Sequence, residues 1–251
     1  MRTRSFPARA ALALALLLAP GMALAAVTVK GKLVNVQDLL NPVWNEAKEP
    51  KNNRFNFREP SPTVRGDIRV LRAHLHKEVC IVAIADAGAK NDKPLRMVVE
   101  GGRASPVTLV VAQGQEIQLE NHDPWPHQIY EVSGKGGIGE GVMAPQGTRK
   151  WTPPGPGKYE IRDRISPSIR SWVVVEPKAA AIAYPTRKGE FAIDLEPGSY
   201  KLRAYHAGEP VGDELPIEVK PAPAEQPLAA PLKAGKDPAP PKDPKGDGKG
   251  G

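Results

Sequence analysis

The chain has 251 residues, of which 40% are hydrophobic and 25% are charged. A chain of this length and composition can bury one or two hydrophobic cores, which excludes a wholly disordered protein. The 24 glycines and 28 prolines favour short strands joined by turns over long helices. The formal net charge of +7 falls to about +4 without the arginines of the first 25 residues, too mild a charge to indicate a nucleic-acid-binding protein.

The first 25 residues have the organisation of a secretory signal peptide. Three arginines accompany an apolar run at 10–19, and the small-x-small sequence Ala23-Leu24-Ala25 follows it. The apolar run is shorter than the roughly 20 residues that a membrane-spanning helix needs. We therefore expect a periplasmic or secreted protein without a transmembrane span.

Cys80 is the only cysteine, so the chain cannot form an internal disulfide bond. It lies within the continuous apolar run Val79-Cys80-Ile81-Val82-Ala83-Ile84, which predicts a buried strand. We expect a buried thiol here, with a reactive or intermolecular thiol as the alternative.

Alternation with a period of two dominates the middle of the chain and predicts half-buried strands. Turns rich in glycine and proline separate these strands, which favours β-sandwiches. The stretch 37–62 lacks this alternation and is interpreted as a long loop. The clearest alternating segments are 116–120, 159–162 and 191–195.

Residues 221–251 consist almost wholly of Pro, Ala, Lys, Asp and Gly and contain no aromatic residue. Such a segment has too little apolar surface to offset the entropy lost on ordering. We therefore predict a disordered tail that is either an inert solubilising segment or a tether.

The segment 107–175 resembles the cupredoxins, the β-sandwich family of small blue copper proteins. The resemblance is carried by a strand at 108–111, a strand that ends in Asn121, a loop that ends in His127, and strands at 159–161 and 171–175. In that family the histidine after the Asn-containing loop is a copper ligand, and His127 matches it. The resemblance implies a cupredoxin-like sandwich over 96–177.

The other copper ligands of the family are missing from this sequence. Asp163, Ser166 and Ile169 stand where a cysteine, a histidine and a methionine are expected. A blue copper centre requires the thiolate, and a carboxylate is too hard a ligand to replace it. His127, His122 and Asp163 have donor types that suit Zn²⁺ or Cu²⁺ and are the candidate metal ligands. We favour the alternative, a degenerate scaffold that holds no cofactor.

The segments 186–191 and 195–204 resemble the closing strands of the carboxypeptidase regulatory-like domain. This domain is a transthyretin-like sandwich that is also grouped with carbohydrate-binding-like folds, and residues 27–34 match its opening strand. Related bacterial exported proteins, often labelled methylamine-utilisation-like, insert a cupredoxin between the two halves. The resemblance thus implies an all-β protein of two sandwiches, in which 26–95 and 178–220 make up one and 96–177 the other.

Three further histidines are weaker candidates. His74 and His76 would share one face of a strand, with Glu78 or Cys80 as the nearest further ligand, and we interpret them as part of a solvated strand face. His206 is in phase with the apolar residues before it, which indicates a hydrogen-bonded histidine at the edge of a core.

The sequence contains no Ser, His and acid set in a recognisable nucleophile motif. We therefore expect a non-enzymatic binding or structural module of the cell envelope whose partner is a protein or a glycan. The alternatives are a periplasmic metal-binding protein that uses His127, His122 and Asp163, and an enzyme of unrecognised type.

Overall fold

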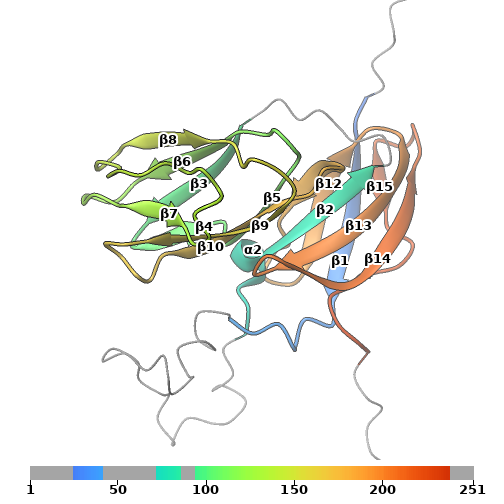
Figure 1. Ribbon diagram of the computed structural model, residues 1–251. Helices are drawn as coiled ribbons and strands as arrows, with labels where there is room; N and C mark the ends of the chain where they lie inside the picture. The colour runs from blue at the N-terminus through green and yellow to red at the C-terminus, as the bar shows by residue number, and fades with distance from the viewer. Residues whose placement is uncertain (1–24, 42–71, 86–93, 238–251) are drawn as a thin grey trace, which may run out of the picture.

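The computed structural model describes residues 25–41, 72–85 and 94–237. Nearly all elements in these ranges are β-strands, and the one helix among them is the single turn α2 (Leu75–Glu78). The expected all-β class is therefore confirmed. Four four-stranded sheets form two sandwiches that lie side by side (Figure 1). Within the described ranges, no helix has the length and apolarity needed to cross a membrane.

One sandwich, here called the terminal sandwich, uses strands from both ends of the described chain. Its first sheet has the order β12-β1-β15, with β16 also paired to β1, and its second has the order β11-β2-β13-β14. The strands are β1 (Val27–Val34), β2 (Val79–Ala85), β11 (Ala179–Ala183), β12 (Glu190–Leu195), β13 (Gly198–His206), β14 (Glu209–Val219), β15 (Glu225–Pro227) and β16 (Leu232–Lys233).

Segments that are distant in sequence meet in both of these sheets. β1 pairs antiparallel with β12 from Val27 opposite Leu195 to Lys32 opposite Glu190, and β2 lies between β11 and β13. Alternate residues of these strands fill one core, in which Val29, Ile81 and Leu202 are fully buried. The opening strand β1 and the strand that contains Phe191, β12, are therefore neighbours in one sheet.

The other sandwich, here called the inserted sandwich, is formed by the chain between β2 and β11. Its sheets have the orders β4-β3-β6-β8 and β5-β10-β9-β7. Its core includes Met97, Leu119, Ile161 and Val173. The strands are β3 (Leu95–Glu100), β4 (Arg103–Ser105), β5 (Thr108–Val111), β6 (Ile117–Asn121), β7 (Ile129–Glu131), β8 (Thr148–Trp151), β9 (Gly157–Asp163) and β10 (Arg170–Val175).

A third buried cluster joins the two sandwiches. Tyr184 Oη donates a hydrogen bond to Thr108 O (3.0 Å), and Ala207 N donates to Thr108 Oγ1 (2.9 Å). Burial raises the pKa of the Cys80 thiol to about 12, and Cys80 has no exposed surface, which confirms the expected buried thiol. The apolar members of the cluster include Cys80, Val82, Val110, Val174 and Tyr205.

The prediction of a disordered tail over 221–251 is wrong for residues 221–237. β15 and β16 pair in parallel with β1, Leu232 is fully buried, and Ala234 is 5% exposed. Composition could not reveal this segment, because β1 supplies its backbone partners and few of its apolar side chains, Leu228, Leu232 and Ala234, pack on the core. Residues 238–251 lie outside the described residues. We call residues 221–237 the C-terminal strap.

Two other expectations concern segments that are only partly described. The expected signal peptide, 1–25, and most of the expected loop 37–62 lie outside the described residues. Leu40 forms an isolated bridge with Arg72. The placement of His74 and His76 on one strand is wrong, because His74 precedes α2 and His76 belongs to it.

Candidate functional site

His127 lies in the loop between β6 and β7, at one end of the inserted sandwich. Its side chain has no exposed surface. His127 N donates to Met143 O (2.9 Å), and Met143 N donates to His127 O (2.7 Å). These two bonds hold the His127 loop against the loop that precedes β8, so the ring is fixed in the interior rather than presented to solvent.

Each ring nitrogen of His127 faces a buried carboxylate. Nδ1 lies 3.0 Å from Asp163 Oδ2, and Nε2 lies 3.1 Å from Asp123 Oδ2. Both carboxylates are 3% exposed. The structure therefore brings two of the predicted residues, His127 and Asp163, together and adds Asp123, which the sequence interpretation missed.

His122, the third predicted ligand, is separate from this cluster. Its side chain is 39% exposed, and its Nε2 lies 3.1 Å from Glu120 Oε2. Glu120 also accepts a hydrogen bond from Arg96 Nε (2.6 Å), and this guanidinium holds the pKa of Glu120 below its ordinary value. The expected set of His127, His122 and Asp163 is therefore wrong as a single cluster, because His122 contacts Glu120 instead.

Backbone amides hold the two aspartates in place. Asp123 accepts hydrogen bonds from Gly101 N (2.5 Å) and Gly102 N (2.9 Å), and Asp163 accepts from Ile165 N (2.5 Å). Burial would raise the pKa of Asp123, but the two glycine amides and His127 outweigh it, so this pKa lies below its ordinary value. Gly101 and Gly102 have φ angles of +60° and +66°, a conformation that glycine adopts without strain.

The donor set at His127 does not fit a metal ion. The two carboxylates lie against different ring nitrogens, so one ion bound at either nitrogen could reach only one of them. In the described part of the chain, no three His, Cys, Asp or Glu side chains are grouped closely enough to hold a metal ion. The arrangement is instead that of a buried hydrogen-bonded network of one imidazole and two carboxylates.

Asn121, at the end of β6, fastens the loops around His127 to one another. Its side-chain amide donates to Trp125 O (2.9 Å), Met143 O (3.3 Å) and Ala144 O (2.9 Å). Its Oδ1 accepts a hydrogen bond from Asp123 N (2.9 Å). One buried side chain therefore bonds to both loops, which fixes their spacing.

Large apolar side chains are exposed on the loops that meet at His127. Trp125 is 41% exposed, Val142 60% and Ile165 47%. The Trp125 ring lies 6.3 Å from the His127 ring, Val142 directly precedes Met143, and Ile165 N is bonded to Asp163. We call these three side chains and the loops that bear them the loop end. Sequence alternation could not find it, because none of the three belongs to a strand.

Another buried carboxylate, that of Glu78, lies in the terminal sandwich at the end of α2. Glu78 accepts hydrogen bonds from Asn41 Nδ2 (2.8 Å) and His74 N (3.1 Å). His206 Nε2 lies 3.8 Å from Glu78 Oε2 and has no hydrogen-bond partner among the described residues. The expectation of a hydrogen-bonded His206 is therefore not met at this nitrogen, although the residue is buried at the edge of a core.

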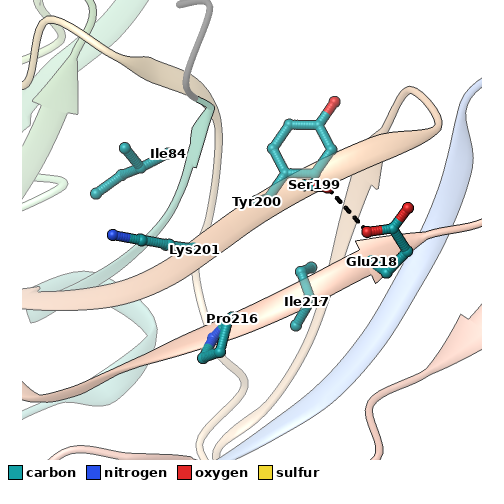
Figure 2. Close-up of a pocket in the computed structure, with 7 residues that line it drawn as sticks. All are labelled: Ile84, Ser199, Tyr200, Lys201, Pro216, Ile217 and Glu218. Carbon is teal, nitrogen blue, oxygen red and sulfur yellow. Dashed lines mark hydrogen bonds between the residues drawn. The ribbon is translucent and has the colours of Figure 1, made fainter.

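A shallow depression lies on the β2-β13-β14 sheet, far in sequence from His127. Figure 2 shows Ser199 and Glu218 joined by a hydrogen bond, which is 2.8 Å long, on neighbouring strands. Lys201 Nζ lies 3.6 Å from Glu214. Because its charges are of opposite sign and already have partners, the depression offers no concentrated charge to an ionic ligand. Ile84, Tyr200, Pro216 and Ile217 complete its lining.

No family model matches the chain, and no curated protein matches it. Solved cupredoxin structures are similar to part of it. A reduced mutant of amicyanin is 20% identical over 39% of this chain and 99% of its own, with a TM-score of 0.30. A purple cupredoxin from Nitrosopumilus maritimus is 17% identical over 33% and 99%, with a TM-score of 0.29. Amicyanin from Paracoccus versutus is 20% identical over 38% and 91%, with a TM-score of 0.30. At this level of similarity, nothing about ligands or partners transfers to this chain.

Proposed function

We propose that the protein is a non-enzymatic binding module of the cell envelope that contacts a protein partner through the loop end. The observation that carries the proposal is the exposure of Trp125, Val142 and Ile165 on loops that are fixed from beneath by Asn121 and His127. Exposed apolar side chains gathered at one place are typical of protein contact sites. Loops that are already ordered lose little entropy when a partner binds.

The surroundings of these side chains support a protein partner. Prolines 124, 126, 145 and 167 are also exposed on the same loops. The acidic groups Asp123 and Asp163 are buried, so they add no charge to this surface. Exposed Arg164 and His122 flank it. A protein surface with an apolar centre and acidic residues at its rim would complement this arrangement.

The burial of His127, Asp123 and Asp163 supports a binding role over a catalytic one. These three residues are between 0% and 3% exposed. The amide and imidazole groups that face the carboxylates already satisfy them. A substrate would have to break this network before it reached any reactive atom, whereas a partner protein needs only the exposed side chains above it.

The proposal is tested by site-specific photo-cross-linking in the cells that export the protein. A photoreactive residue is placed at Val142, at Ile165, or at exposed Lys188 in the terminal sandwich as a control. We expect one discrete cross-linked protein from the first two positions and not from Lys188. Trp125→Ala should reduce the cross-link without lowering the melting temperature. Equal cross-linking from all three positions, or no effect of Trp125→Ala, would refute the proposal.

A metal titration tests the alternative function directly. Added Cu²⁺ should produce no intense absorption near roughly 600 nm, because His127 has no thiolate beside it. Tight stoichiometric binding of Cu²⁺ or Zn²⁺ that is abolished by His127→Gln would support the metal-binding alternative and count against a purely structural network. His122→Gln is the matched control.

A further inference from the structure

The first and last described strands of the chain lie side by side and run in the same direction. β15 pairs in parallel with β1 from Thr28 opposite Glu225, and β16 continues the pairing at Leu33 opposite Leu232. β1 and β15 are neighbours in the terminal sandwich (Figure 1). Everything between residues 35 and 224, which includes the whole inserted sandwich, is therefore enclosed between these two paired segments.

The parallel direction determines how tension would pass through the protein. A force applied to the chain before Val27 acts on the first residue of β1, at one end of the ladder. A force applied after Lys233 acts on the last residue of β16, at the opposite end. The two strands would have to slide along each other, so that their hydrogen bonds share the load instead of opening one after another. The strands that lie between β1 and β15 in sequence are outside this load path while the ladder holds.

Several contacts oppose such sliding. Thr28 N donates to Ala224 O (2.9 Å), Leu228 N to Lys30 O (2.8 Å) and Ala234 N to Val34 O (2.9 Å).

Leu232 is buried between the two sheets, and the ion pair of Lys30 with Glu225 (2.7 Å) spans the ladder. Gly212, at φ +69°, allows β14 to pack directly on the carbonyl of Lys233, where a Cβ would collide. On its other edge β1 is held by β12, so β1 cannot slide without disturbing a second ladder.

We propose that β1 and the C-terminal strap form a tension-bearing clamp that shields the inserted sandwich, and the strands β2 to β14, when the protein is pulled at both sides of this ladder. The clamp would keep the loops of the inserted sandwich folded while the chain is under load. The proposal goes beyond the binding function and does not depend on it, because the clamp is defined by the terminal strands alone.

The test is single-molecule pulling on the mature protein with handles at two cysteine pairs. The pair Ala26→Cys with Lys236→Cys loads the ladder lengthwise, whereas Ala26→Cys with Ala222→Cys opens the same ladder from one end. All three positions are exposed, and Cys80 is buried. The first rupture force should be about threefold higher in the lengthwise geometry, because at least three hydrogen bonds then break together. Equal forces, or partial unfolding of a sandwich before the clamp opens, would overturn the proposal.

A second comparison tests the role of the buried anchor. Leu232→Ala should lower the lengthwise rupture force, whereas Leu40→Ala, at a leucine that is 37% exposed and outside the ladder, should leave it unchanged. Leu232→Val serves the same purpose if the alanine variant does not fold. An unchanged force in the folded Leu232 variant would also overturn the clamp.

Discussion

Replacing His127 by alanine should destabilise the protein far more than the loss of an ordinary loop histidine. The change leaves Asp123 and Asp163 buried without the ring that faces both of them. Leaving a buried polar group without its hydrogen-bond partner costs about 1–3 kcal/mol, and more for a charged group. Backbone amides still bond to both carboxylates, so we expect a total loss of about 3 kcal/mol.

Urea unfolding at pH 7, with a chelator present to exclude metal effects, measures this change as a shift in midpoint at constant slope. His122→Ala is the matched control and should cost less than about 1 kcal/mol, because the side chain of His122 is 39% exposed. In a double-mutant cycle, Asp123→Asn should recover part of the loss by removing one of the unpaired charges. If His127→Ala lowered the free energy of unfolding no more than His122→Ala, or showed no coupling to Asp123→Asn, the stabilising role of the His127 network would be refuted.

Three further predictions concern the rest of the fold. Leu232→Ala should lower the free energy of unfolding by about 2–5 kcal/mol and the melting temperature by several degrees, because Leu232 is fully buried. Leu40→Ala should change the melting temperature little. Equal effects of the two variants in a thermal scan would contradict the ordered C-terminal strap. The free energy of unfolding should fall as the pH drops below about 4, because the pKa values of Asp123 and Glu131 lie below their ordinary values in the folded state and their stabilisation is lost on protonation. Glu131→Gln should make this fall less steep in acid titrations. An unchanged slope in that variant would contradict the stabilising role of Glu131. Cys80, whose pKa burial raises to about 12, should resist a thiol reagent at pH 8 until the protein is unfolded, and rapid labelling of the native protein would contradict its burial.

Local patterns in the sequence were sufficient for the class of the fold and for several positions in it. The alternation at 116–120, 159–162 and 191–195 corresponds to β6, β9 and β12. The continuous apolar run around Cys80 corresponds to β2, which is covered on both faces. These predictions succeeded because burial of one or both faces of a strand leaves a pattern within a few neighbouring residues.

The partners of individual polar groups could not be predicted in this way. Asp123 lies four residues before His127, but nothing in that spacing distinguishes a carboxylate that faces the ring from one in solvent. His206 approaches Glu78 only because β13 ends beside α2. Such pairs depend on how strands from distant parts of the chain are placed in three dimensions.

The sequence by itself therefore determined that the protein is all-β and that Cys80 is buried. Only the tertiary structure decided that His127 is held between Asp163 and Asp123, that His122 is elsewhere, and that residues 221–237 complete a sheet. The physical reason is that composition and periodicity record how much surface a segment can bury, whereas hydrogen-bond partners and strand edges depend on how segments are placed in three dimensions.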